Sequence, residues 1–554
     1  MILAFEFNYV SNNGILENLL KEIANDFDIS HKIIRKDSIV TLFVEEDETR
    51  LCTFADTLSA SLPLSIFFKS SSVEVVDTMS DITEVIPPLA YTIEFTPKIL
   101  ASVDNPNSEY YLAPFISASR TNVKLYQNEN ELLHGSDAKA YEAVYDRLAE
   151  LIANGENVTI QTKNGSYVYG KIENIASCTQ ALEVIATDLS VVERMVVCRE
   201  NEIKALASLE RPAIRFKVNA LFSQKGILKE ARVILRLADD LFMYQLSKRL
   251  FSKGVQFLFK ATTQNCKASY SVQFDAKLQA IEPLLVSVLE NGAILIVKGS
   301  DYASSTLKAS LEKFDEPSHG AFASIMQEHQ LFDATTSCFY LSTLHNDRIM
   351  HYSKEHGMLN LIEISLPSSF EELFAEIGRS SPNAERLVAN YKEQFPEIYA
   401  KAIETIIPSD TPKSIYSLWK IVAMVLGLSE TFESAAEQLI ENAEDFGGQK
   451  GPRIDYFLQK EDALSSDIDY VRLVRSGISY KLAGTDNTTL SFGYMESLSY
   501  FISDLCDTHK ENLLTSKIAL GGSLFGYKRF SEMIAKNLKP NHTICFNKEL
   551  PIDQ

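Results

Sequence analysis

The sequence predicts a multidomain protein that combines α/β and α+β domains. Its 554 residues exceed what one domain of about 100–200 residues holds. Hydrophobic residues make up 45% and charged residues 23% of the chain, which is typical of globular proteins and not of disordered, collagen-like or coiled-coil ones. Strand-like alternation and helix-like periodicity follow one another along the chain, so each part is expected to bury a core of its own.

Charge and hydropathy exclude several classes of partner. The chain has 53 Lys and Arg against 74 Asp and Glu, a net charge of −21, which disfavours nucleic acid and anionic lipid. The longest apolar stretch, 415–428, is interrupted by Lys420 and is shorter than the roughly 20 residues that a membrane span needs. The start MILAFEFNYVSNN lacks the basic segment of a signal peptide. We therefore expect a cytoplasmic protein.

The cysteines predict neither a disulfide framework nor a zinc ribbon. There are 7 of them, scattered along the chain and nowhere arranged as CxxC. Most are expected to be buried, reduced thiols.

Residues 1–85 are expected to form a ferredoxin-like domain. SIVTLFVEE alternates as a strand does, whereas ILENLLKEIA has the i, i+3, i+4 apolar spacing of a helix. The predicted order is βαββαβ, which defines a split βαβ sandwich. Its strands are expected at 2–9, 31–34, 39–45 and 64–69, and its helices at 14–27 and 49–60.

Beyond residue 85 the sequence predicts a connector and two further domains. Residues 86–130 contain five prolines with several Asn and Ser, the composition of an irregular segment. Residues 131–254 open with a helix at 138–153, a turn at Asn154-Gly155 and a strand at 158–162. Residues 255–554 read as a large α/β unit. Its strands are expected at 256–260, 293–297, 338–344 and 517–520, and its helices at 401–406, 414–428, 433–444, 494–507 and 528–538.

Several stretches, taken in order, resemble the hydrogenase maturation carbamoyltransferase family HypF. SIYSLWKIVAMVLGLSETFESAAEQLIENAE (414–444) is similar to the family's helix pair, IALGGSLFGYKRF (518–530) to its glycine turn, and CFNKELPID (545–553) to its last strand and acidic loop. SHGAFASIMQEHQL (318–331), NPNSEYYLAPFISASR (105–120) and ANGENVTIQTKNGSYV (153–168) are similar to three further family segments. The resemblance implies acylphosphatase-like (1–85), zinc-finger (86–130), YrdC-like (131–254) and ASKHA-type, or actin-like ATPase, modules (255–554).

The phosphate loop of the acylphosphatase-like module departs from the family pattern. The family motif VQGVGFR supplies backbone N–H groups and one arginine, because a phosphate dianion needs several donors and a fixed cation. Here VSNNGIL (10–16) places Leu16 at the arginine position, and Arg35-Lys36 stand near the position of a water-orienting asparagine. We expect phosphate hydrolysis to be lost, and an ordinary turn in a packing domain is the alternative interpretation.

The zinc and YrdC-like motifs are also altered. Ala118 and Ser119 replace the thiols of the zinc-finger segment, so no zinc is expected. In the YrdC-like segment Lys163 could replace the family's nucleotide-binding lysine, but only Arg194 remains of the basic stretch. The alternative for Lys163 is a solvated turn lysine.

The metal site of the actin-like module is expected to be dismantled. The resemblance places Pro317 and Ala321 at its two histidine positions and leaves His319 and the carboxylate of Asp553 as candidate ligands. The favoured interpretation of His319 itself is a surface or capping histidine.

A glycine turn and one acidic residue complete the candidate nucleotide site. Gly521, Gly522 and Ser523 follow an apolar strand and precede a helix, which lets the backbone approach a nucleotide, ATP or AMP, at a helix N-terminus. The alternative is that these glycines only permit tight packing. Glu433 matches an acidic position of the family, but it also suits a helix N-terminus.

The sequence as a whole favours a HypF-like pseudoenzyme. On this hypothesis the chain keeps the surfaces that dock a HypE-like maturation protein or a hydrogenase precursor, and has lost most catalytic residues. One alternative is an active ATP-dependent carbamoyltransferase with a rebuilt site. Another is an unrelated cytoplasmic adaptor, whose domains would not superpose on the family.

Because thiol pairs and the HxxxH motif are absent from the sequence, the purified protein is expected to contain neither zinc nor iron in stoichiometric amount. Elemental analysis after dialysis measures this. One equivalent of metal retained per chain would contradict the expectation.

Overall fold

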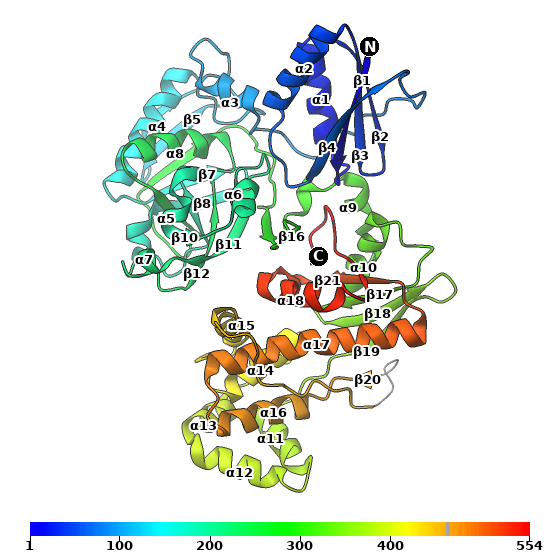
Figure 1. Cartoon of the computed structure of the whole chain (residues 1–554). Coiled ribbons are helices and arrows are strands. Elements are labelled where there is room, and N and C mark those ends of the chain that lie inside the picture. Colours follow the sequence, from blue (N-terminus) through cyan, green and yellow to red (C-terminus); the bar gives the residue numbers. More distant parts are fainter. Residues whose placement is uncertain (312, 461–465, 554) are drawn as a thin grey trace. The chain divides into compact units, whose positions relative to one another are not determined.

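The computed structural model describes residues 1–311, 313–460 and 466–553. The chain forms two compact units. The first unit contains residues 1–288, 292–308 and 548–550, and the second contains 289–291, 309–547 and 551 onward. Each unit is described by itself below (Figure 1).

The first unit begins with the predicted ferredoxin-like sandwich. Its antiparallel sheet has the strand order β2-β3-β1-β4. The elements are β1 (Ile2–Tyr9), α1 (Ile15–Asp26), β2 (Ser30–Lys36), β3 (Ile39–Glu45), α2 (Glu48–Ser61) and β4 (Phe68–Val76). The predicted order βαββαβ is therefore confirmed.

Local sequence explains most of this sandwich. Phe5, Phe7 and Tyr9 occupy alternate positions along β1 and are buried. The Phe5 ring packs edge-on against that of Phe54 on α2, with 5.9 Å between the ring centroids. Asp47 caps α2 by accepting from the backbone N–H of Arg50. The first part of the strand predicted at 64–69 is wrong, since β4 begins only at Phe68.

The rest of the first unit is built on a 12-stranded sheet. Its order is β16-β15-β11-β12-β9-β13-β8-β7-β14-β5-β6, and β10 pairs with β11. The strands are β5 (Val123–Gln127), β6 (Asn130–Gly135), β7 (Val158–Thr162), β8 (Gly165–Lys171), β9 (Glu183–Ala186), β10 (Val196–Val197), β11 (Ala213–Val218), β12 (Arg232–Arg236), β13 (Phe257–Ala261), β14 (Tyr270–Phe274), β15 (Leu285–Val288) and β16 (Ile294–Lys298).

The first unit also contains helices, two of which pack against each other. Tyr145 and Leu148 of α4 pack in one buried cluster with Phe242 and Leu246 of α8. The helices are α3 (Pro97–Asp104), α4 (Ala138–Ala153), α5 (Val192–Met195), α6 (Glu200–Leu206), α7 (Ala220–Ser223), α8 (Leu241–Ser252) and α9 (Ser305–Leu311), with 3-10 turns η1 (Ile172–Ser177), η2 (Leu189–Val191) and η3 (Ser300–Tyr302).

Two predicted features differ here from the structure. The segment 86–130 is not wholly irregular, because it contains α3 and β5. The boundary expected near residue 255 falls inside the sheet, since β13 pairs with both β8 and β9. Helix 138–153 and strand 158–162 lie where they were predicted.

The second unit contains a 6-stranded sheet of order β20-β19-β18-β17-β21-β22 and a group of helices (Figure 1). The strands are β17 (Thr336–Tyr340), β18 (Arg348–Ser353), β19 (Gly357–Glu363), β20 (Ser466–Asp467), β21 (Lys517–Gly521) and β22 (Thr543–Cys545). The helices are α10 (Pro317–Glu328), α11 (Phe370–Arg379), α12 (Ala384–Gln394), α13 (Pro396–Glu404), α14 (Ile415–Val425), α15 (Ala435–Asp445), α16 (Tyr470–Leu482), α17 (Asn487–Leu513) and α18 (Lys528–Leu538), with the 3-10 turn η4 (Ser523–Gly526).

The apolar stretch 415–428 forms α14 and lies in the core. Trp419 on this helix is fully buried, and its indole N–H donates to the Tyr456 hydroxyl at 2.8 Å. Among the residues that the structure describes, no helix is both long and apolar enough to cross a membrane.

The expectation of unpaired cysteines is wrong at one place. Cys178, after η1, is bonded to Cys266, 88 residues further along the chain. Sequence spacing carries no signal for such a pair, because β8, β9 and β13 bring the two loops together. Cys338, Cys506 and Cys545 are buried and form no disulfide, but Cys52 is exposed and Cys198 is half-buried, so the expectation that most cysteines are buried, reduced thiols is wrong.

Two histidines of the second unit are buried around one hydroxyl. Ser337 Oγ lies 3.2 Å from His351 Nδ1 and 3.1 Å from His509 Nδ1. Burial, and then the neighbouring His351, lowers the pKa of His509 to about 4, and burial also lowers the pKa of His351. Both rings are therefore neutral near pH 7.

Stability should fall on acidification because of His509. The unfolded chain takes up a proton near the ordinary pKa of 6.5, whereas the folded chain takes it up only near 4. The contribution of neutral His509 to the free energy of unfolding is thus complete above pH 6.5 and is lost as the pH falls toward 4. The free energy of unfolding then decreases by up to about 1.4 kcal/mol per pH unit. Denaturant unfolding of His509→Asn should show a flatter pH profile than wild type, whereas the exposed control His134→Asn should not. Parallel profiles for wild type and His509→Asn would contradict this.

Candidate functional site

The glycine turn of the second unit lies against the end of β17. Gly522 has φ +98°, and a Cβ atom there would overlap with the Leu341 carbonyl oxygen. Leu341 donates its N–H to the Gly521 carbonyl at 2.9 Å and accepts from the Leu524 N–H at 3.0 Å. Glycine at 522 is therefore required by the chain's own packing, whether or not a ligand binds.

The carboxylate of Asp553 accepts from both donors of Ser523 in this turn. Asp553 Oδ2 accepts from the Ser523 N–H at 2.9 Å and from Ser342 Oγ at 2.6 Å. The hydroxyls of Ser523 and Tyr340 also donate to this carboxylate. The candidate residues Ser523 and Asp553 are thus brought together, but they bind each other.

A second buried carboxylate supports the same region. Asp347 accepts from the backbone N–H groups of Ser342 and Ile415, both at 2.7 Å, and so joins the loop after β17 to the start of α14. Burial raises the pKa of Asp347 well above its usual value. No sequence motif pointed to this residue, because both of its partners are backbone groups.

The loop 10–16 of the first unit is occupied in a similar way. Glu549 Oε2 accepts from the backbone N–H groups of Asn12 and Ser304, both at 3.2 Å, and from the Ser11 hydroxyl. Its other oxygen accepts from Ser304 Oγ at 3.2 Å. Burial raises the pKa of Glu549, and these donated bonds oppose the rise. A carboxylate of the chain therefore accepts the hydrogen bonds of Ser11 and Asn12 in loop 10–16.

Arg35 holds this loop from the other side. Its guanidinium donates to the carbonyls of Ser11 at 2.8 Å and Tyr9 at 3.1 Å, and pairs with buried Glu17 at 2.6 Å. The charge of Arg35 is thus directed at carbonyl and carboxylate oxygens of the protein. Leu16 is buried on α1, so the arginine position of the family motif belongs to the apolar core.

Lys163 is not a solvated turn lysine. It lies in the turn between β7 and β8 with 13% of its side chain exposed, and its Nζ is 3.5 Å from Glu94 Oε2. Burial lowers the pKa of Lys163, but the charge of Glu94 outweighs this effect and raises it. Its surroundings are acidic, so Lys163 neutralises carboxylates and offers little attraction to a phosphate.

The residues next to Lys163 form a buried cluster of charged side chains. Asp239 accepts from Arg236 at 2.8 Å and from Asn164 Nδ2 at 2.6 Å. Burial raises the pKa of Asp239, but the charge of Arg236 outweighs it, and the net shift is downward. Burial, and next the charge of Asp239, raises the pKa of Asp240 to about 8.

Sequence reasoning missed this acidic pair. The signal was present, because RVILRLADD is an apolar strand followed by two aspartates, and Asp240 caps α8 through the N–H of Met243. One oxygen of Asp240 lacks a hydrogen-bond partner among the residues that the structure describes. A buried carboxyl with a raised pKa and a free oxygen is suited to proton transfer.

Glu433 and His319 both belong to the second unit. Glu433 is exposed in the turn before α15, which agrees with a role at a helix end. His319 lies in the first turn of α10, and its Nδ1 is 3.8 Å from Glu316. No group of three or more His, Cys, Asp or Glu able to hold a metal occurs in residues 1–311, 313–460 and 466–553.

Solved structures share this fold over its whole length. The crystal structure of full-length HypF in the phosphate- and nucleotide-bound form matches with a TM-score of 0.64 at 14% identity, covering 100% of this chain and 96% of that chain. HypF of T. kodakarensis matches with a TM-score of 0.69 at 12% identity, covering 99% of this chain and 95% of that chain. The chain thus has the fold of HypF, the mixed α/β multidomain class predicted from the sequence.

One curated protein is similar to this chain in sequence over its whole length. Protein HydE of Wolinella succinogenes is 27% identical over 570 residues, covering 100% of both chains. No family model matches the sequence. The resemblance to HypF is confirmed, and the alternative of an unrelated adaptor whose domains would not superpose on the family is wrong.

Removing the Glu549 side chain should destabilise the first unit. Glu549→Ala leaves two backbone N–H groups without a partner, at a cost of about 1–3 kcal/mol for each buried group that stays unpaired. Glu549→Gln should cost less, because its carbonyl oxygen can accept from both N–H groups while its amide donates to Ser304 Oγ. Denaturant unfolding compares these variants with the exposed control Asp410→Asn. Equal stability of the Ala and Gln variants would contradict the assigned geometry.

Proposed function

We propose that this chain is a HypF-like pseudoenzyme that acts in hydrogenase maturation, in the cytoplasm, as a docking partner or scaffold. The observation that supports this most directly is the occupation of two donor loops by carboxylates of the chain itself. Glu549 lies in loop 10–16, and Asp553 lies at Gly521, Gly522 and Ser523. Groups that would bind the anions of a substrate are thereby used to stabilise the fold.

Competition explains why such loops would bind anions poorly. Glu549 and Asp553 are covalently tethered, so each competes with a free anion at a high effective concentration. An incoming phosphate must also approach beside a carboxylate and within a protein of net charge −21. We therefore propose that any nucleotide, ATP or AMP, binds the Gly521–Ser523 turn only weakly, and that no zinc is needed.

The retained fold supports a role in docking. The match to HypF covers 95–96% of the solved chains, so surfaces from every module can persist after catalysis is lost. We propose a HypE-like maturation protein or a hydrogenase precursor as the partner. The similarity to protein HydE over its full length supports a common role for these two chains.

One observation favours the alternative of an active ATP-dependent carbamoyltransferase with a rebuilt site. The cluster of Lys163, Asp239 and Asp240 combines burial, opposite charges and one carboxyl with a pKa raised to about 8. Such a cluster could replace lost catalytic groups. On this alternative, Asp240 would be the proton-transfer residue.

One experiment with a matched variant separates the two proposals. In the organism that carries the gene, deletion should abolish hydrogenase activity. The pseudoenzyme proposal expects both wild type and Asp240→Asn to restore it, because binding does not require a titrating carboxyl. Restoration by wild type and not by a folded, equally abundant Asp240→Asn protein would favour the rebuilt enzyme.

A direct assay completes the test. Purified protein with carbamoyl phosphate, ATP and magnesium should release no phosphate, AMP or pyrophosphate above the rate without protein. Turnover that depends on carbamoyl phosphate and disappears in Asp240→Asn would overturn the pseudoenzyme proposal.

A further inference from the structure

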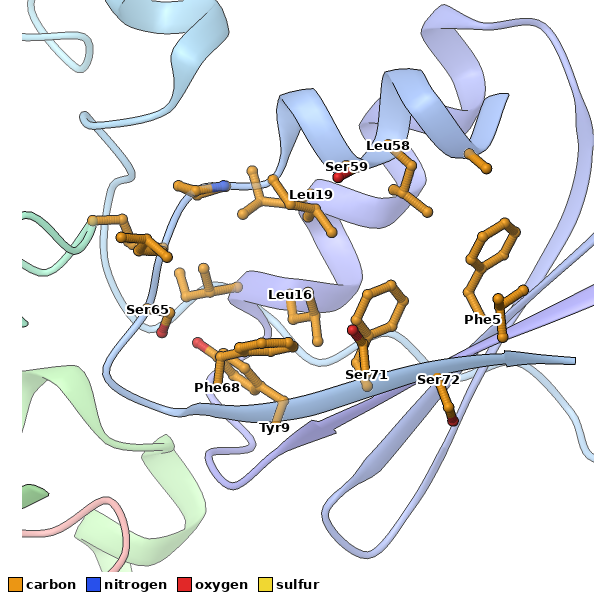
Figure 2. A pocket seen from close by; sticks show the side chains of 18 residues that line it. Phe5, Tyr9, Leu16, Leu19, Leu58, Ser59, Ser65, Phe68, Ser71 and Ser72 are labelled. Carbon is orange, nitrogen blue, oxygen red and sulfur yellow. The ribbon is translucent and has the colours of Figure 1, made fainter. Parts of the chain in front are cut away.

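The ferredoxin-like sandwich encloses an apolar pocket that the function proposed above does not use. Its volume is about 410 Å³, and it lies between β1 and β4 on one side and α1 and α2 on the other (Figure 2). Leu16 and Leu19 of α1 and Leu58 of α2 line it beside Phe5 and Tyr9 of β1. These five side chains are buried, so the pocket reaches into the core of the sandwich.

Small residues keep this pocket open. Ala55 and Ser59 share one face of α2, being four residues apart, and Ser71 stands on the inner face of β4 opposite Phe7. Larger apolar residues at these positions would close the core. An unfilled apolar cavity is destabilising, and a ligand that fills it restores lost contacts.

The mouth of the pocket is apolar too. Leu64 is 53% exposed, Phe68 38% and Val73 56%, and all three line the pocket. Exposed large apolar side chains gathered around a cavity are typical of a ligand-binding site. The packing of the sandwich itself gives no reason for their exposure.

The polar groups of the lining define the ligand further. None of the 18 lining residues is charged. Tyr9 donates its hydroxyl to Asn13, and Ser65 donates to Glu210, so these two are engaged. Ser59 and Ser71 make no side-chain hydrogen bond to any residue within the described part of the chain, so their hydroxyls can bond to a ligand.

We propose that this pocket binds a small, uncharged and mainly apolar molecule that carries one hydroxyl or carbonyl group. The depth of the pocket favours a compact molecule over an extended peptide, which would lie along the edge of β4. A charged group is excluded because it would be desolvated without a partner. The volume lies within the range of about 300–1,000 Å³ that small-molecule sites occupy.

Two neighbouring serines provide a matched test. Ser71 points into the pocket. Ser72, opposite Glu6, also borders the pocket, but its side chain points to the other face of β4 (Figure 2). Both are exposed on an edge strand, where phenylalanine is compatible with β-structure. Ser71→Phe fills the pocket, and Ser72→Phe adds the same ring outside it.

N-phenylnaphthylamine, an uncharged fluorophore, serves as the probe with the full-length protein. We expect saturable binding to wild type, a Kd within about twofold of this for Ser72→Phe, and binding weakened at least about tenfold for Ser71→Phe. The sulfonated analogue anilinonaphthalene sulfonate should bind wild type at least about tenfold more weakly, because its charge finds no partner in the pocket.

The melting temperature of each variant, measured with and without the probe, distinguishes loss of binding from loss of stability. The probe should raise the Tm of wild type and of Ser72→Phe but not that of Ser71→Phe, which should itself melt at or above wild type. Three outcomes would overturn the proposal: equal binding by both variants, tighter binding of the sulfonate, or a probe-free dimer in sedimentation that Ser71→Phe disrupts. The last would show that a second copy of the chain occupies the pocket.

Discussion

The donation of backbone N–H groups to carboxylates of the chain itself is the interaction on which both loops depend. In loop 10–16 the acceptor is Glu549, and in the turn after β21 the acceptor is Asp553. These two carboxylates are four residues apart in the sequence. Buried N–H groups need an acceptor, and a carboxylate satisfies several donors at once. A phosphate would meet the same need only while bound. A tethered side chain meets it permanently, so both loops keep an acceptor for these N–H groups whether or not a ligand binds.

The buried charged side chains of the first unit are likewise paired with other side chains of the protein. Lys163 pairs with Glu94, and Arg236 pairs with both Asp239 and Glu183, the latter at 2.9 Å. Removing one member of such a set leaves an unpaired charge at low dielectric, which costs more than the intact pair contributes. Each of these side chains therefore depends on its partner to keep its charge paired. A cluster of this kind persists for structural reasons alone, which is why Asp240 with its raised pKa supports but does not decide a catalytic role.

Local sequence patterns predicted many of the helices and strands correctly. They did not predict which residues remote in sequence contact one another. Alternation located β1 at Ile2–Tyr9, and helical periodicity with a cap located α4 at Ala138–Ala153, because these signals lie within each segment. The strand predicted from residue 64 failed, since buried Ile66 and Phe67 serve as turn residues before β4. Lys163, Cys178 and Glu549 were misjudged or unassigned because their partners, Glu94, Cys266 and Ser11, are remote in sequence. The departures from family motifs were visible in the sequence, but the carboxylates that accept from loop 10–16 and from the turn after β21 were not.

The bond between Ser11 and Glu549 also orders events during synthesis. The two residues are 538 positions apart, so at about 5–20 residues per second the ribosome adds Glu549 roughly 30–110 s after Ser11. Throughout that interval the nascent loop 10–16 has its N–H donors uncovered, while the strands and helices around it are free to fold. The acceptor for loop 10–16 of the amino-terminal sandwich is consequently supplied by a segment translated hundreds of codons later.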